Sequence, residues 1–237
     1  MSTHDPAQRE VGNRLLSKLT GEELEALGPH MQQVSLAHAE PLILPQEPVR
    51  HVYFPINALA SLVTILEDGS TVEAGSVGRE GMVGIPVLLN AGMTPMQTLV
   101  QIPGEAIKIK AEAIKAEFDK GGQLHNLLNR YVHTLFVVGS QSAACYRRHH
   151  IEARLARWLL MSSDGVASCQ LALTQEFLAT MLGVRRSGVT EAALNLQNDG
   201  LITYNRGRVH ILERERLEEC ACECYRMVRD EYERLLG

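Results

Sequence analysis

The sequence has few aromatic side chains, no cysteine before Cys145 and no long apolar run. Phe, Trp and Tyr make up 5% of the 237 residues, with a single Trp. No segment approaches the roughly 18 apolar residues of a membrane span, and residues 1–10 are polar, unlike a signal peptide. Five cysteines, three of them at Cys220, Cys222 and Cys224, do not form a disulfide framework. We therefore expect a cytoplasmic protein in a reducing compartment, without a membrane segment.

What the sequence does have is the composition of a globular protein. It is 45% hydrophobic and 22% charged, which excludes wholesale disorder. The net charge of −5 is unevenly distributed. Residues 145–214 carry nine Arg and six acidic residues, a net charge of +3, while the remainder carries 14 basic and 22 acidic residues, a net charge of −8. A basic segment of this kind is where an acidic protein can bind nucleic acid.

The first half of the chain alternates short apolar runs with turn residues. Residues 14–28 predict a helix, in which Thr20 and Glu23 form a capping box. Residues 34–110 then contain several short apolar runs separated by prolines. The Asp68-Gly69 pair between two of these runs predicts a β-hairpin with a two-residue turn, because Asp-Gly tolerates positive φ. Many short strands at this spacing favour a small antiparallel barrel or sandwich.

Residues 111–149 change to helical spacing, with a strict repeat of 4 and 3 positions. The residues in this repeat are Leu124, Leu128, Tyr131, Leu135, Val138, Ser142 and Cys145. A period of 3.5 is typical of a coiled-coil seam. A helix packed on its own domain would also show an apolar stripe, but three unbroken heptads favour a dimer interface. Gly139 beside the seam would allow two helices to approach closely.

The second half predicts a helix-turn-helix. Residues 150–162 predict a helix that stops at Asp164-Gly165. Residues 174–182 and 185–198 predict two helices joined by a short turn at Gly183. Two helices with a short connection that contains Gly are the plan of a helix-turn-helix.

A basic hairpin and a final helix follow this motif. Residues 201–212 predict two short strands around the turn Arg206-Gly207, which together with the preceding helices indicate a winged helix. Residues 213–236 predict one continuous helix. On such a helix Cys220 and Cys224 share a face and Cys222 points away. Three thiolates arranged in this way would not converge on one ion, so we expect no metal site.

The segment from Thr174 to Thr190, followed by Gly200-Leu-Ile and Arg206-Gly-Arg-Val, resembles the Crp/Fnr family of bacterial transcription regulators. Residues 47–54 and 76–81 are similar to segments of the family's β-roll. The resemblance covers nearly the whole chain and implies an α+β fold. Its parts are an N-terminal antiparallel β-roll of jelly-roll type, similar to a cyclic nucleotide-binding domain, with flanking helices (residues 1–117), a dimerisation helix (residues 118–149) and a winged helix-turn-helix domain with a C-terminal helix (residues 150–237).

The resemblance also implies a function. A regulator of this family binds double-stranded DNA as a homodimer at a symmetric operator, contacts RNA polymerase and is not an enzyme. The alternative from another class is a cupin-like metalloenzyme, which would need several His and a carboxylate on adjacent strands. Residues 34–110 contain only His38 and His51, and we find no set of catalytic residues.

The effector is where the sequence departs from the family. Members that respond to cyclic nucleotides hold the phosphate with an Arg late in the β-roll, and Met96 stands at the matching position. A buried phosphate needs a paired cation or several donors, so we expect an effector other than a cyclic nucleotide. A cyclic-nucleotide-responsive regulator that uses Arg79 instead is the alternative. Without N-terminal cysteines the chain lacks the family's iron–sulfur ligands, and we expect no cofactor.

The candidate DNA contacts lie on the second helix of the motif and around it. Val189, Ala193 and Leu196 form its buried stripe, so its remaining faces are free for DNA. We expect base contacts from Arg186, Ser187 and Thr190, because residues near the start of a recognition helix reach base edges and Arg can grip guanine O6 and N7. The expected backbone contacts are Thr174, Gln175, Arg185, Arg206 and Arg208.

Overall fold

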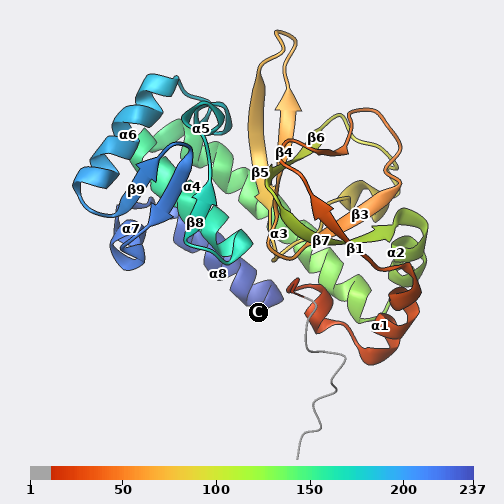
Figure 1. The fold of residues 1–237 in the computed structure, drawn as a ribbon. Helices are drawn as coiled ribbons and strands as arrows, with labels where there is room; N and C mark the ends of the chain where they lie inside the picture. Colours follow the sequence, from red (N-terminus) through yellow and green to blue (C-terminus); the bar gives the residue numbers. More distant parts are fainter. Residues whose placement is uncertain (1–11) are drawn as a thin grey trace, which may run out of the picture.

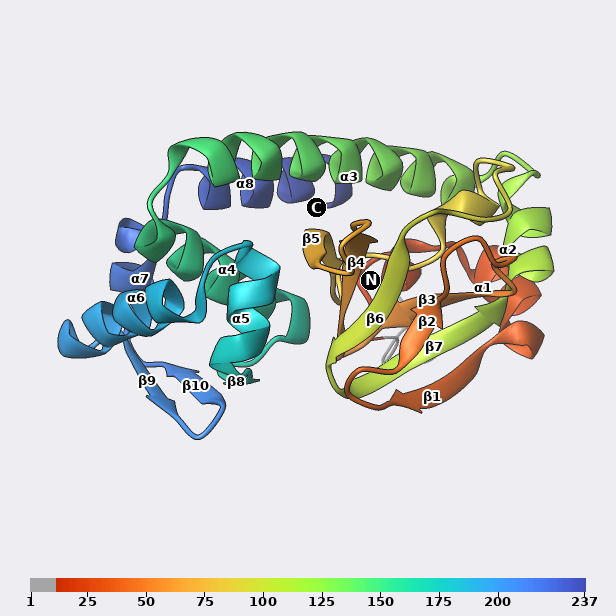
Figure 2. The same cartoon turned by 90° about the horizontal axis from the view of Figure 1, so that it is seen from above.

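The computed structural model describes residues 12–237. An N-terminal β-roll and a C-terminal helical domain lie side by side, and α3 (Gln123–Arg148) runs along both of them (Figures 1 and 2). In this part of the chain no helix is both long and apolar enough to cross a membrane. The polar start at residues 1–10, where we expected no signal peptide, lies outside the described residues.

Two antiparallel sheets build the β-roll. One has the strand order β1-β7-β3 and the other β2-β6-β4-β5. The strands are β1 (Gln32–Leu36), β2 (Pro41–Ile43), β3 (His51–Pro55), β4 (Leu59–Ile65), β5 (Thr71–Val77), β6 (Gln97–Ile102) and β7 (Gly104–Lys110). Val52, Phe54 and Ile109 are fully buried and pack against the helices. The prediction of many short antiparallel strands is confirmed.

The β4–β5 hairpin extends beyond the rest of the β-roll (Figure 1). The predicted hairpin is present, but the two-residue turn is wrong. The Leu66 N–H donates to the Ser70 carbonyl at 2.9 Å, which leaves three residues in the loop. Gly69 takes the left-handed position with φ +80°, as is typical of a three-residue hairpin loop.

The N-terminal helical region is shorter than predicted. The capping box at the start of α1 (Gly21–Leu27) is confirmed: the Glu23 N–H donates to Thr20 Oγ1 at 3.2 Å, and the Thr20 N–H donates to Glu23 Oε2 at 3.1 Å. The prediction that this helix starts at residue 14 is wrong. Thr20 is extended, with ψ 159°, so the preceding residues form a separate 3-10 turn. The 3-10 turns are η2 (Leu16–Lys18), η3 (Gly28–His30) and η4 (Ile85–Val87).

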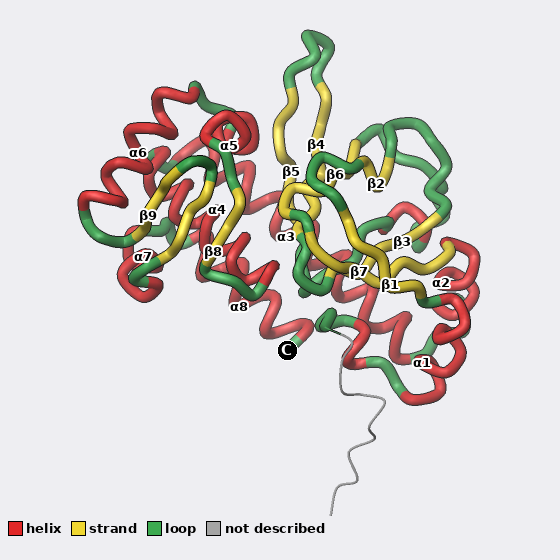
Figure 3. Tube along the Cα trace, viewed as in Figure 1, coloured by secondary structure: helices red, strands yellow, loops and turns green. Residues whose placement is uncertain are grey.

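The C-terminal domain contains the predicted motif and wing. Its helices are α4 (Ile151–Val166), α5 (Gln175–Leu182), α6 (Arg186–Asn198) and α7 (Arg214–Cys220), and its strands are β8 (Gln170–Ala172), β9 (Ile202–Asn205) and β10 (Arg208–Ile211). The strands form a sheet of order β8-β10-β9, which lies beside the helices (Figure 3). The helix-turn-helix and the hairpin therefore occur where the sequence predicted them.

Two helix boundaries in this half were predicted wrongly. α4 does not stop at Asp164-Gly165 but continues to Val166, and Ala167, with φ +53°, is the residue that ends it. The final segment is not one helix either. α7 ends at Cys220, Ala221 is extended with ψ 150°, and α8 (Cys224–Leu236) starts anew.

The two domains contact each other directly. Trp158 Nε1 donates to Glu73 Oε1 at 3.0 Å, and both side chains are buried. The Arg79 N–H donates to the Gly165 carbonyl at 2.8 Å. Gly78 lies against the same turn of α4, where a Cβ on Gly78 would come 2.6 Å from the Gly165 carbonyl oxygen. Glycine at both positions lets the two backbones touch.

α2 (Ala111–Phe118) leads from the β-roll into α3. The buried face of α3 packs on the β-roll near its start and on α8 further along, and Figure 2 shows α8 running beside it. Tyr131 lies in this core and its hydroxyl donates to the Met82 carbonyl at 3.3 Å. Val228 and Tyr232 of α8 belong to the same apolar cluster.

Candidate nucleic-acid interface

The motif is held together by the predicted apolar stripe. Val189, Ala193 and Leu196 on α6 are at most 1% exposed, and they share one cluster with Leu178 and Leu182 of α5. The sharp turn between the helices comes from Gly183, which ends α5 with φ +61°. Because one face of α6 is fixed against α5 in this way, the opposite face is left to solvent.

The three candidate base-contacting residues lie at the start of this exposed face. Arg186 is the first residue of α6, and Arg186 and Ser187 are exposed. Thr190 is half-buried: its Oγ1 lies 3.0 Å from Gln175 Oε1 and 3.0 Å from the Arg186 carbonyl. Its proton is therefore used inside the protein, while its oxygen can still accept a hydrogen bond.

The candidate backbone contacts at the helix starts flank that face. Thr174 is the N-cap of α5 and its Oγ1 accepts from the Phe177 N–H at 3.2 Å. Its hydroxyl proton is left to donate to a phosphate oxygen. Gln175 is half-buried against Thr190, and Arg185 is the exposed N-cap of α6.

The wing brings two further cations to the motif. Arg206 and Gly207 form the turn between β9 and β10 with φ +47° and +76°, the geometry of a two-residue type I′ hairpin. Arg206 and Arg208 are exposed. The Leu173 N–H donates to the Gly207 carbonyl at 2.7 Å, so the wing is attached to the start of α5.

Tyr204 connects the wing to the same segment. Its hydroxyl donates to the Leu173 carbonyl at 2.9 Å. Burial raises the pKa of Tyr204 to about 12, and the positive charge of Arg186 opposes this shift. The phenol is therefore neutral at physiological pH and remains a donor.

The predicted dimer seam on α3 is covered within the chain. Leu135 is half-buried, and the other six seam residues are buried: Leu124, Leu128, Tyr131, Val138, Ser142 and Cys145. The β-roll, α4, and α8 with the linker before it supply the side chains that cover them. A neighbouring face of α3, next to the seam, carries Phe136, which is 73% exposed.

A cavity of about 410 Å³ lies between the β-roll and α3, and both Met96 and Leu135 line it. Its lining of described residues contains no charged side chain, and Thr94 and Thr98 supply its side-chain hydroxyls. Arg79 lines a separate cavity of about 610 Å³ between the domains. Arg79 is the cation on which the cyclic-nucleotide alternative depends. It therefore does not line the cavity that contains Met96.

The comparisons with known proteins agree with this geometry. Residues 153–220 match the family model of the Crp-like helix-turn-helix domain. A comparison with curated protein sequences gave no significant match. Among solved structures, the chain is similar to a putative Crp/Fnr-family transcriptional regulator from Eubacterium rectale, with 16% identity, a TM-score of 0.66 and coverage of 89% of this chain and 99% of that one.

Two other solved structures show the same fold. A CRP-family transcriptional regulator from Thermus thermophilus is 23% identical, with a TM-score of 0.63 and coverage of 80% and 96% of the two chains. The c-di-GMP-responsive global regulator CLP from Xanthomonas campestris is 17% identical, with a TM-score of 0.60 and coverage of 81% and 99%.

The fold and the motif define a class: DNA-binding transcription regulators. Residues 153–220 are a Crp-like helix-turn-helix domain, and the chain as a whole shares the fold of the Crp/Fnr-family regulators to which it is similar. The predicted α+β fold is confirmed. This domain and this fold are those of transcriptional regulators and not of enzymes, so the cupin-like alternative does not apply.

Proposed function

We propose that the protein binds a two-fold symmetric DNA operator as a cytoplasmic homodimer and acts there with RNA polymerase. The observation that supports this proposal is the exposed start of α6, where Arg186 and Ser187 stand free between Arg185 and the two wing arginines, Arg206 and Arg208. In this class of fold the start of the second helix enters the major groove. Two copies would present two such helices to half-sites about one helical turn, roughly 34 Å, apart.

The contacts divide by position. We assign base reading to Arg186, Ser187 and Thr190, because they lie on the exposed face of the recognition helix. Thr174, Gln175, Arg185, Arg206 and Arg208 surround that face, and we assign them to the phosphate backbone, which positions a protein without reading sequence.

We place the dimer contact on the exposed face of α3. Six of the seven seam residues are already buried in the single chain, so they have little surface to give to a second copy. The neighbouring face carries the exposed residues Phe136, Gly139 and Ala143 and the half-buried Val132, again at spacings of 4, 3 and 4. Nothing lies within 4 Å of a Cβ built on Gly139, so a second helix can approach closely there.

We infer that neither cyclic AMP nor cyclic GMP is the effector. The uncharged lining of the Met96 cavity supports this inference, because an anionic phosphate placed there would lose its water without gaining a cation. A calorimetric titration of the full chain with each nucleotide should show no binding at micromolar concentrations. Micromolar binding of either one would support the cyclic-nucleotide alternative instead.

The DNA assignment is tested by binding isotherms over a series of salt concentrations. An operator is first selected from random duplexes with the full chain, and a scrambled duplex is the comparison. Arg186→Ala should cost about 1–3 kcal/mol on the operator and little on scrambled DNA. Arg208→Ala should weaken both and lower the salt slope by about one unit.

The control for these variants is Arg226→Ala, which removes an exposed arginine of α8 and should change neither affinity. An equal loss on both duplexes for Arg186→Ala would make Arg186 a phosphate contact and leave base reading to Ser187 and Thr190. No change on either duplex would show that α6 is not the recognition helix.

A further inference from the structure

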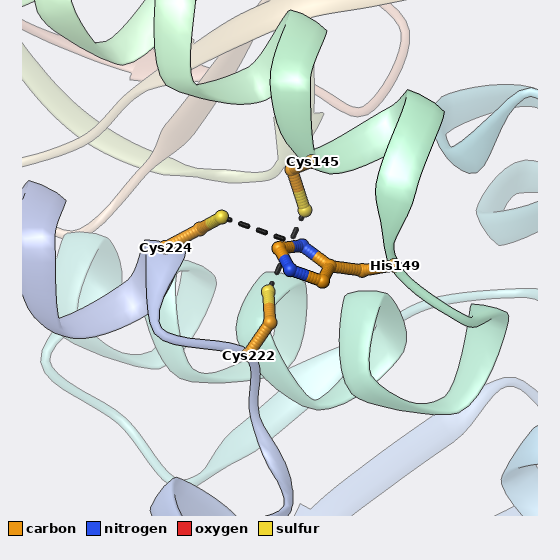
Figure 4. Close-up of side chains that lie close together, drawn as sticks. All are labelled: Cys145, His149, Cys222 and Cys224. Carbon is orange, nitrogen blue, oxygen red and sulfur yellow. Dashed lines mark hydrogen bonds between the residues drawn. The ribbon is translucent and has the colours of Figure 1, made fainter.

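Three of the five cysteines and one histidine meet where α3, α4 and α8 come together. Cys145 lies in the last turn of α3, and His149 is the residue that ends this helix. Cys222 lies in the linker after α7, and Cys224 is the first residue of α8. Figure 4 shows the four side chains pointing toward one another. One potential ligand atom of each lies within 4.8 Å of all the others.

The break in the final helix makes this convergence possible. The sequence predicted that Cys222 and Cys224 lie on one continuous helix, where they would point in different directions. Because Ala221 is extended and α8 begins only at Cys224, both thiols turn toward α3. His149 approaches from the end of α3, and its Nδ1 faces Cys224 Sγ at 3.5 Å.

The spacing of these atoms fits one tetrahedral ion. Zinc–sulfur bonds of about 2.3 Å and zinc–nitrogen bonds of about 2.0 Å give a tetrahedron whose S–S edge is about 3.8 Å and whose S–N edge is about 3.5 Å. Cys145 Sγ and Cys222 Sγ are 3.5 Å apart, and Cys224 Sγ and His149 Nδ1 are also 3.5 Å apart. An iron–sulfur cluster divides its protein ligands between two or more iron atoms, which would place some of the ligand atoms further apart.

The groups around the four side chains complete the arrangement. His149 presents Nδ1 to the thiols while its Nε2 lies 3.2 Å from Glu223 Oε1, as in the carboxylate–histidine pairs behind metal ligands. Gln141 Nε2 donates to Cys224 Sγ at 3.0 Å. Cys224 stands at the start of the 13-residue α8, so its sulfur lies at the positive end of the helix dipole. These contacts orient the sulfur and the imidazole nitrogen toward one centre.

Charge is compensated on the other side of the cluster. Three thiolates and one divalent cation carry a net charge of −1, and Arg157 on α4 is buried nearby. Its Nη2 donates to Ser142 Oγ at 2.9 Å, one turn before Cys145 on α3. A buried arginine beside a thiolate site provides the opposite charge that such a site needs.

We propose that Cys145, His149, Cys222 and Cys224 bind one thiophilic divalent cation, with Zn²⁺ as the best fit. Thiolate and imidazole ligands select zinc over the oxygen-preferring Mg²⁺ and Ca²⁺. Four protein ligands leave no open position for a substrate, which makes the site structural. The ion joins α8 to the end of α3, next to the extended residues His149 and His150 that separate α3 from α4.

The test is metal analysis of the full chain, purified with reduced thiols and then loaded with zinc. Wild type should retain one zinc per chain after removal of excess metal. Cys222→Ser should retain less than about a tenth of that. Cys169→Ser is the matched control, because Cys169 is exposed and outside the cluster, and it should retain the full amount. Glu223→Gln, at an exposed position, should bind zinc about 10–100-fold more weakly with the fold intact.

Cobalt substitution gives a readout of the ligand set. Co²⁺ in the wild-type chain should show thiolate charge-transfer absorption and the intense d–d bands of a tetrahedral site, and both should be lost in Cys222→Ser. An octahedral cobalt spectrum or no retained zinc would overturn the proposal, as would equal losses in Cys169→Ser. A Cys145–Cys222 disulfide in protein isolated without air would overturn it as well.

Discussion

Glu73 is a carboxyl group buried between the two domains. Its oxygens accept hydrogen bonds from Ser61 Oγ at 2.6 Å and from Trp158 Nε1 at 3.0 Å. Burial raises the pKa of Glu73 above its ordinary 4.5, against the opposing effect of these two hydrogen bonds and of the Arg157 charge. The native chain therefore holds this proton more tightly than the unfolded chain does.

The sign of the pH effect follows from that difference. Protonation of Glu73 favours the native state at low pH, and this contribution is lost as the pH rises from 4.5 through the native pKa. Glu73→Gln cannot ionise and keeps an oxygen for Trp158. The free energy of unfolding of Glu73→Gln minus that of wild type should therefore be larger at about pH 8 than at about pH 5, because only wild type loses stability as Glu73 ionises. Urea denaturation at both pH values checks this, and a constant difference would mean that Glu73 ionises normally.

At the scale of elements, α3 has two apolar faces with different partners. The Leu124-to-Cys145 seam packs inside the chain, whereas the face with Phe136 is exposed. Phe136 offers a large apolar side chain there, and the small residues Gly139 and Ala143 beside it leave room for a second helix to pack closely. Sequence periodicity alone could not separate these faces, because both follow the same 4-3 spacing.

Phe136→Asp should turn the proposed dimer into monomers or weaken it strongly. The substitution places a charge where a second α3 would desolvate it, while leaving the buried face of the helix unchanged. Light scattering at several protein concentrations measures the mass. Met227→Asp, at an exposed position of α8, is the control and should remain dimeric. A dimer as stable as the parent in Phe136→Asp would place the interface elsewhere.

The sequence predicted the elements whose signals are local. The capping box at Thr20, the turn at Gly183 and the wing turn at Arg206-Gly207 each depend on residues a few positions apart. The stripe of α6 was predicted for the same reason, so the exposed start of that helix could be identified. The roles assigned to Arg186 and its neighbours in DNA binding remain predictions.

The features that were missed depend on contacts between distant segments. No Gly or Pro marks the break between α7 and α8, so the cysteines seemed to lie on one helix. Cys145 and Cys222 are 77 positions apart, and only the packing of α8 on α3 brings them together. The burial of Cys145 could be predicted from its place in the repeat, but the identity of its neighbours could not.

At the scale of the whole molecule, the junction of the two domains rests on a backbone contact. Gly78 at the end of β5 and Gly165 in α4 touch without side chains between them. The single tryptophan of the chain lies at the same junction and is 5% exposed. Its fluorescence therefore reports whether the DNA-binding domain stays docked on the β-roll.

Gly78→Ala should separate the domains, because the new Cβ would overlap the Gly165 backbone, which no side-chain rotation can relieve. Overpacking of this kind costs about 1–3 kcal/mol, and loss of docking avoids that strain. We expect Trp158 emission to shift to longer wavelength and acrylamide quenching to increase. Gly75→Ala, on β5 three positions earlier with nothing within 4 Å of its Cβ, should leave both unchanged. Unchanged emission and quenching in Gly78→Ala would mean that small backbone shifts accommodate the new Cβ. The domains would then stay docked without this contact.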